Sequence, residues 1–177
     1  MLTSMILGMS LAGFTQLHVA ISIFAIVAGF LVVFGMLAGK RWPLLTALFL
    51  ITTAATSITG FMFPYHGVTP GIVVGILSMI VLLLATIALY GGHLAGGWRG
   101  TYVVTATLAL YLNFFVLIVQ SFEKVPALHS LAPTGKEMPF KVAQLLALVV
   151  FVVLGVLAYR KFKVVHLRDA GGPSSGT

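Results

Sequence analysis

One short segment of the sequence gathers polar and charged side chains that could bind a ligand. It reads NFFVLIVQSFEKVPALHS, residues 113–130, and places Asn113, Gln120, Glu123, Lys124 and His129 among apolar residues. Each residue turns an α-helix by about 100°, so Asn113, Gln120 and Lys124 fall within about 40° of one another on a helical wheel. We therefore predict one polar stripe, running along a helix from its outer end toward the membrane centre.

Polar side chains from other segments are expected at a similar depth. Gln144 lies about one turn inside the last apolar stretch, and His18 lies at the start of the first. Because polar groups are costly in hydrocarbon, they should face the bundle interior or a wet cavity. We predict an outward-facing pocket beneath residues 122–139, with aromatic walls, for a small or amphiphilic ligand such as a quinone or a lipid. The predicted ligand-binding residues are Asn113, Gln120, Gln144, His18, Lys124 and Glu123.

A plainer interpretation of the same residues stays open. The amides and hydroxyls could pair with one another across helices and leave no cavity. Glu123 and Lys124 then form only the lip of a membrane helix, since a lysine can extend its charged end to the headgroups. The segment 127–131, held between prolines, is predicted to form a short helix lying on the bundle as a lid.

The histidines offer a weak case for a metal or a haem. His18, His66 and His129 are predicted on the same side of the membrane, and imidazole binds zinc and copper. Their spacing includes no His-x-x-x-His pair, so no metal site is predicted. A b-type haem needs two histidines on facing helices at one depth, whereas His18 and His93 are predicted at opposite ends of their spans. Haem and metal binding are kept as alternatives to the quinone or lipid ligand.

Enzymatic chemistry has little support in the sequence. The chain holds three acidic residues and no cysteine, and it shows no Ser-His-Asp arrangement and no glycine loop that could hold a phosphate. Glu123 is the one acid beside the polar stripe, so proton transfer would depend on it almost alone. We expect a protein without enzymatic activity.

The composition indicates which elements must position these residues. Hydrophobic residues make up 60% of the 177 and charged residues 7%, whereas soluble domains carry about a quarter charged residues. The chain is therefore expected to be an all-α integral membrane protein, since backbone groups in lipid must bond within their own helix. A span needs about 20 apolar residues. Five segments qualify, at about 17–38, 44–63, 71–90, 102–121 and 140–159.

The two ends of the chain are predicted to lie outside this bundle of residues 15–163. Residues 1–14 are apolar and are expected to form an interfacial or tilted extension of the first helix, with Gly8 and Gly13 as places to bend. Residues 164–177 have the composition of a flexible linker and are predicted to be a disordered cytoplasmic tail.

The basic residues predict an orientation. One side of the bundle is assigned seven of the ten and the other side three, which places the first side in the cytoplasm and the N-terminus outside. The net charge of +7 is thereby explained without nucleic acid, and the lipid bilayer is the expected partner. The seven are Lys40, Arg41, Arg99, Arg160, Lys161, Lys163 and Arg168; the three are Lys124, Lys136 and Lys141.

Three runs of the sequence carry a family resemblance. LYLNFFVLIVQSFEKVPALHSLAPT with the following PFKVAQ, TSITGFMFP and HLAGGWRGTYVVTA resemble a family of small, uncharacterised bacterial inner-membrane proteins with several spans. The likeness covers most of residues 14–163 and implies a bacterial membrane bundle, but it implies no activity and no site residue. Such a chain could also act as an accessory subunit of a larger membrane complex or as a small-solute transporter. It could also form a homo-oligomer.

Overall fold

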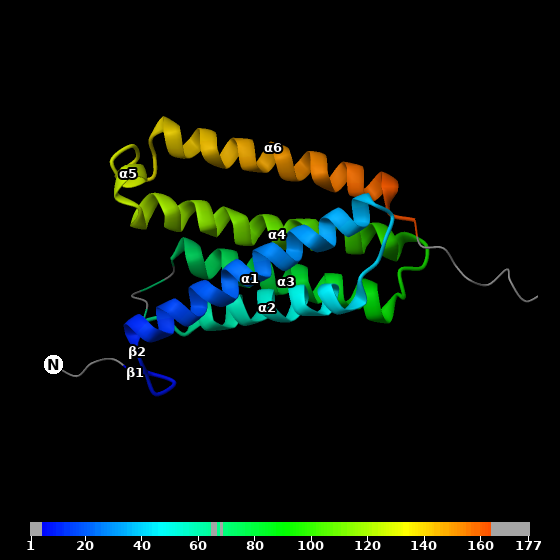
Figure 1. Cartoon of the computed structure of the whole chain (residues 1–177), viewed down its shortest axis with the longest axis horizontal. Helices are drawn as coiled ribbons and strands as arrows, with labels where there is room; N and C mark the ends of the chain where they lie inside the picture. Colours follow the sequence, from blue (N-terminus) through cyan, green and yellow to red (C-terminus); the bar gives the residue numbers. More distant parts are fainter. Residues whose placement is uncertain (1–4, 65–66, 68, 164–177) are drawn as a thin grey trace, which may run out of the picture.

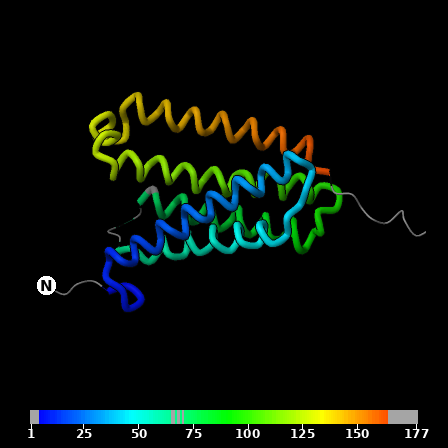
Figure 2. Tube along the Cα trace, in the orientation of Figure 1, coloured from blue at the N-terminus to red at the C-terminus, as the bar shows by residue number. Residues whose placement is uncertain are grey.

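The computed structural model describes residues 5–64, 67 and 69–163, and it confirms the predicted all-α bundle (Figures 1 and 2). Five helical segments in this part of the chain are long and apolar enough to cross a membrane. They run antiparallel to their sequence neighbours, so α1 begins at the end of the bundle opposite to the one where α6 ends (Figure 1). The elements are α1 (Leu11–Leu37), α2 (Pro43–Phe61), α3 (Pro70–Thr86) with its π-helical continuation η1 (Ile87–Gly91), α4 (Gly97–Lys124), α5 (Pro126–His129) and α6 (Met138–Lys161).

Local signals in the sequence account for several helix starts. Pro43 and Pro70 occupy the first positions of α2 and α3, where a missing N–H costs nothing. Thr69 caps α3 by accepting a hydrogen bond from the backbone N–H of Ile72 at 3.4 Å. Helix α4 extends beyond the predicted 102–121 at both ends.

The N-terminal extension was expected to continue the first helix in an interfacial or tilted position, and it does so in residues 11–14 but not in residues 5–10. Strands β1 (Met5–Ile6) and β2 (Met9–Ser10) form a small antiparallel hairpin, with Met5 opposite Ser10. Leu7 and Gly8 turn the chain with φ of 52° and 77°, as a two-residue hairpin turn requires. The Ser10 hydroxyl then accepts a hydrogen bond from the Gly13 N–H at 3.2 Å and starts α1 at Leu11. Gly13 is therefore part of a regular helix and is no bend.

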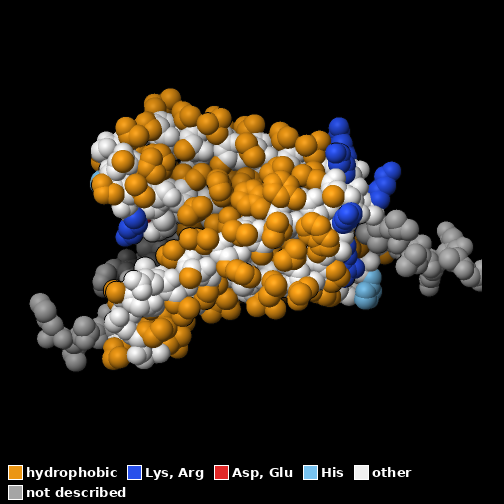
Figure 3. Space-filling model, in the orientation of Figure 1, with side chains coloured by type: hydrophobic (Ala, Val, Ile, Leu, Met, Phe, Trp, Pro, Cys, Tyr) orange, Lys and Arg blue, Asp and Glu red, His pale blue; other side chains and the backbone are white. Residues whose placement is uncertain are grey.

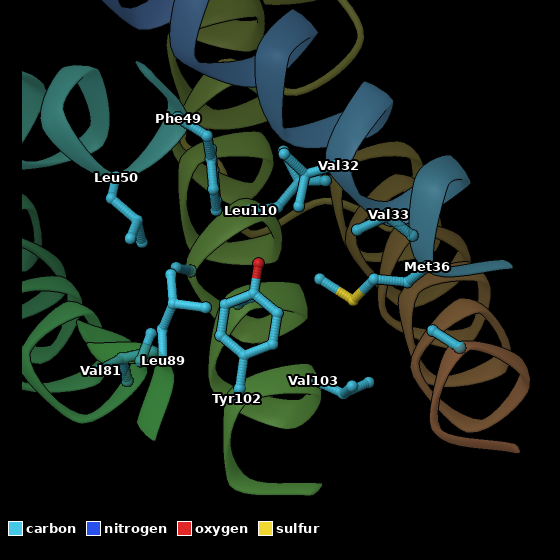
Figure 4. Close-up of a cluster of buried hydrophobic side chains, with 14 of the residues drawn as sticks. Val32, Val33, Met36, Phe49, Leu50, Val81, Leu89, Tyr102, Val103 and Leu110 are labelled. Atoms are coloured by element: carbon cyan, nitrogen blue, oxygen red, sulfur yellow. The ribbon is translucent and has the colours of Figure 1, made fainter. Parts of the chain in front are cut away.

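Helix α4 is the centre of the bundle. It packs against α1, α3 and α6, and half of the residues in its most apolar window are buried, against 17% for α6. Figure 4 shows Tyr102, Val103 and Leu110 of α4 among side chains of α1, α2 and α3. Toward α6 the core is aromatic. Phe30 lies 5.9 Å from Phe114 and 5.7 Å from Phe151, measured between ring centroids. Helix α6 is thus the peripheral helix of the bundle.

The connection between α3 and α4 is tight and strained. His93 and Leu94 both have positive φ, at 48° and 59°, although neither is glycine. Leu94 is 1% exposed, so its burial in the core offsets the strained backbone. Gly92 lies so close to the Trp98 indole that a Cβ would approach it within 2.3 Å. Any other residue at that position would require the Trp98 side chain to shift.

Charged side chains lie at the two ends of the bundle. Basic side chains gather at the end where α6 terminates, and the face between the two ends that Figure 3 shows carries mainly hydrophobic side chains. Such a surface suits a membrane protein, with a hydrocarbon-facing belt and a charged end in water. Arg168 of the predicted cytoplasmic set, and the predicted tail at 164–177, lie outside the described residues.

Candidate functional site

Asn113 is buried in the bundle and joins two helices. Its side chain is 8% exposed, and its Nδ2 donates a hydrogen bond to the Thr53 Oγ1 of α2 at 3.2 Å. Thr53 is itself fully buried. The prediction that Asn113 faces inward is confirmed, and its amide nitrogen bonds α4 to α2.

His18 joins α1 to α2 in a similar way. Its Nδ1 lies 2.8 Å from the Thr59 Oγ1. The Thr59 hydroxyl donates its only proton to the Ala55 carbonyl at 2.7 Å, so Nδ1 must be the donor to Thr59 and Nε2 is left as an acceptor. The ring also stands edge-on to Phe63, with centroids 5.2 Å apart. His18 therefore has a partner on α2 and lies on a different helix pair from Gln144.

The outer part of the polar stripe does not turn into the bundle. Gln120, Glu123 and Lys124 are all exposed, and Gln120 Nε2 donates to Glu123 Oε2 at 3.3 Å. Two helical turns separate Gln120 from Asn113, or about 10 Å along the axis. Over this distance the polar face of α4 changes from buried to exposed. Asn113, Gln120 and Lys124 share a face of α4 as predicted, but of these three only Asn113 is buried.

Gln144 is the amide with an unsatisfied group. Its Nε2 donates to the Phe115 carbonyl of α4 at 3.3 Å, while its Oε1 is buried and has no hydrogen-bond partner among the described residues. Exchanging the two amide atoms would not help, because a carbonyl can only accept and so must face the NH₂ group. A buried acceptor without a donor costs about 1–3 kcal/mol. Among the described residues of the predicted site, Gln144 Oε1 is thus the buried acceptor without a partner, and a ligand could supply the missing donor.

Gln144 lies at the interface between α4 and α6, here called the α4–α6 seam. This interface also contains a second buried side-chain atom that has no hydrogen-bond partner among the described residues. The Thr107 Oγ1 of α4 is buried and has no partner in the described chain, and the Thr107 methyl group faces Gly155 of α6. Both buried side-chain atoms without a partner therefore belong to this one interface. Most other polar side chains in the bundle core form hydrogen bonds. The seam therefore has more unsatisfied hydrogen-bonding groups than the rest of the core.

Aromatic rings surround the outer half of the α4–α6 seam. Tyr111 lies 5.6 Å from Phe151 and 6.2 Å from Phe115, and Phe122 stands edge-on to Phe140 at 5.4 Å, all between centroids. The outer half of the seam thus combines apolar walls with the unpaired Gln144 Oε1, and apolar walls with a few polar groups are a common composition for a ligand site.

The loop after α4 folds over this end of the bundle. Helix α5 spans Pro126–His129 and packs on α4, close to the short helix predicted at 127–131, and Ala132 is 2% exposed. Further on, the Glu137 carboxylate accepts hydrogen bonds from the Thr134 hydroxyl at 2.8 Å and from the Lys136 N–H at 2.9 Å. Desolvation acts to raise the pKa of Glu137, but these bonds outweigh it and lower that pKa. The loop is ordered by its own side chains.

Of the histidines considered for metal binding, His18 and His129 belong to no metal-binding group among the described residues. Within residues 5–64, 67 and 69–163, no group of three His, Cys, Asp or Glu side chains could hold a metal ion. His129 Nδ1 lies 3.3 Å from the Phe122 carbonyl, and His18 is engaged with Thr59. His66 lies outside the described residues.

The fold and site define a five-span helical membrane protein, in whose described residues the buried unpaired side-chain atoms lie at one helix interface. Comparison with protein-family models, with curated proteins and with solved structures gave no match. The bacterial family resemblance and the functions discussed with it therefore remain predictions.

Proposed function

We propose that this chain is a non-enzymatic protein of a bacterial inner membrane, with its N-terminus outside and its C-terminus in the cytoplasm, that binds a small amphiphilic ligand. The ligand enters the outer half of the α4–α6 seam, under the loop that contains α5. The observation that carries the proposal is the buried, unpaired Oε1 of Gln144. A ligand that donates a hydrogen bond to this atom removes a cost of about 1–3 kcal/mol from the bound state.

The chemistry of Gln144 restricts the class of ligand. Because Oε1 accepts, the ligand must present an O–H or N–H group beside an apolar body. A hydroquinone hydroxyl meets this requirement, as does the hydroxyl or ammonium group of a lipid headgroup. The neighbouring rings of Tyr111, Phe115 and Phe151 would pack against the apolar part. Such a ligand is dissolved in the bilayer and reaches the seam laterally, past the peripheral helix α6.

The test compares two glutamines of the same chain. Protein purified in mild detergent is extracted, and quinones and lipids are quantified per protein by mass spectrometry. Gln144→Leu is expected to lower retention of the bound species about tenfold, as loss of a hydrogen bond of roughly 1.4 kcal/mol would. Gln120→Leu is the matched control, since Gln120 is exposed and bonds only to Glu123 among the described residues. Equal retention in both variants would show that Gln144 only joins helices.

A second function has its own supporting observation, the exposure of α6. Of its residues, Ala147, Phe151 and Ala158 are buried, and the remaining apolar surface must be covered by lipid, by a second copy or by another subunit of a membrane complex. Copurification in mild detergent separates these outcomes, because an accessory subunit elutes with its partner. The same preparation tests the remaining alternatives, since a cytochrome shows a Soret band, a metal protein contains stoichiometric metal and a transporter moves solute into liposomes.

The orientation is tested separately. Reporter fusions are placed in the loop at Gly135 and after Thr177, and the proposal expects an external signal from the first and a cytoplasmic signal from the second. A cytoplasmic signal at Gly135 would reverse the assignment without affecting the site in the seam.

A further inference from the structure

The opposite half of the α4–α6 seam forms a groove on the membrane-facing surface. It is lined by Val104 of α4 and by Gly155, Val156, Tyr159 and Arg160 of α6, with a volume of about 170 Å³. Its walls are apolar apart from Arg160, and the absence of a side chain at Gly155 helps to keep it open. An engineered cavity of about 150 Å³ holds a benzene molecule, so this groove has room for part of an acyl chain but not for a whole lipid.

The Tyr159 ring forms a fixed end wall of the groove. It packs so closely on Gly100 that a Cβ there would lie 2.7 Å from Tyr159 Cε2, and the Arg99 guanidinium lies 5.0 Å from its centroid. Arg99 Nη1 donates to the carbonyls of Tyr159 and Phe162 at 2.8 and 2.6 Å. These contacts fix Tyr159 and engage Arg99 with the end of α6.

Arg160 is the cation that remains available at the groove. In the part of the chain that the structure describes, no carboxylate pairs with it, and both described acids, Glu123 in the last turn of α4 and Glu137 just before α6, lie at the other end of the bundle. A Cβ at Gly39 would lie 3.7 Å from the Lys161 carbonyl, so the loop between α1 and α2 brings its own cations beside the end of α6. Figure 3 shows the resulting basic end. Its described members are Lys40, Arg41, Arg99, Arg160, Lys161 and Lys163.

We propose that this groove binds an anionic phospholipid. One acyl chain lies along Val104, Gly155 and Val156, and the phosphate pairs with Arg160 at the basic end. Basic pockets between transmembrane helices are suited to anionic headgroups, and the arginine fork binds two phosphate oxygens at once. The site is separate from the one proposed at Gln144, which lies at the other end of the seam and needs a hydrogen-bond donor in place of an anion.

The experiment measures lipid retention by native mass spectrometry on the full chain in detergent. Phosphatidylglycerol and phosphatidylcholine with identical acyl chains are added in turn, and we expect preferential retention of phosphatidylglycerol. Arg160→Gln is expected to lower that retention about fivefold. Lys163→Gln is the matched control, because it removes the same charge from the same end but does not line the groove. If both variants lost phosphatidylglycerol retention equally, the preference would come from the general surface charge of this end, and the proposal would be wrong.

A second variant tests the groove itself. Gly155→Leu fills the apolar wall and is expected to abolish the preference for phosphatidylglycerol, while inorganic phosphate at the same concentration should not displace the lipid. A Cβ at residue 155 meets the Thr107 methyl group at an ordinary 3.5 Å, so the milder Gly155→Ala keeps the fold if the leucine variant does not. Unchanged preference in a folded Gly155→Leu protein, or equal retention of the two lipids by the unmodified chain, would contradict an acyl chain at this place.

Discussion

Replacing Gly29 by alanine tests whether the packing around α4 is as close as the structure has it. A Cβ at Gly29 would lie 2.6 Å from Leu110 Cδ1 and 2.8 Å from Phe49 Cε2. Both neighbours are at most 1% exposed, so neither can move aside freely. Overpacking of this kind costs about 1–3 kcal/mol. The helical gain of alanine over glycine, about 1 kcal/mol in water, contributes little here because transmembrane helices stay helical when the bundle comes apart.

Gly155→Ala is the matched control for Gly29→Ala. Its added methyl group meets Thr107 at 3.5 Å, an ordinary contact, so a change within about 0.5 kcal/mol is expected. Both variants and the unmodified chain are unfolded by increasing mole fractions of sodium dodecyl sulfate, and the transition is followed by tryptophan fluorescence. Gly29→Ala should lose about 1–3 kcal/mol relative to the control. If the two variants were equally stable, the close approach of α1 to α4 described here would be wrong.

Three further perturbations address the polar contacts. A double-mutant cycle of Asn113→Leu with Thr53→Val should return a coupling of about 0.6 kcal/mol and no more than about 1.7 in the same unfolding assay; zero coupling would mean that the two helices do not share this bond. Arg99→Gln should lower the local opening free energy around Phe162 by about 1.5–3 kcal/mol in hydrogen exchange, with Arg99→Lys restoring part of it, and unchanged protection would show that Arg99 does not hold the end of α6. Because the pKa of Glu137 is lowered on folding, the contribution of this carboxylate to folding stability is present above its unfolded-state pKa and is lost as the pH falls through the lowered value. The amide proton shifts of this loop should follow that titration, and Glu137→Gln should abolish the titration.

The sequence alone predicts the architecture because the bilayer imposes few choices. Apolar length identifies each span, and prolines such as Pro43 and Pro70 mark where helices begin. The hairpin before α1 was missed for a physical reason. Its hydrophobic composition is indistinguishable from a helical extension, although Gly8 in the turn and Ser10 as a cap were signals that could have found it.

The site was only partly predictable from the sequence. Helical spacing correctly placed Asn113, Gln120 and Lys124 on one face, but spacing does not say how far neighbouring helices cover that face, so the exposure of Gln120 could not be foreseen. The partner of Gln144 is a backbone carbonyl, at Phe115, and such acceptors leave no mark in the residue pattern. Arg99 was predicted only as one basic charge among seven, and its contacts with the end of α6 depend on the antiparallel register of α4 and α6.

The central place of α4 has a consequence for how the chain assembles during synthesis. Helices α1, α2 and α3 enter the membrane before α4, which packs against α1 and α3 and bonds to α2 through Asn113, so until α4 arrives all three lack these contacts. In the folded bundle, Gly29 and Thr53 are among the small and polar residues that face α4. Before α4 is inserted, these residues must face lipid, one another or the insertion machinery. Helix α6, by contrast, arrives when the other four can already be packed, and it completes the bundle by docking on a preformed surface.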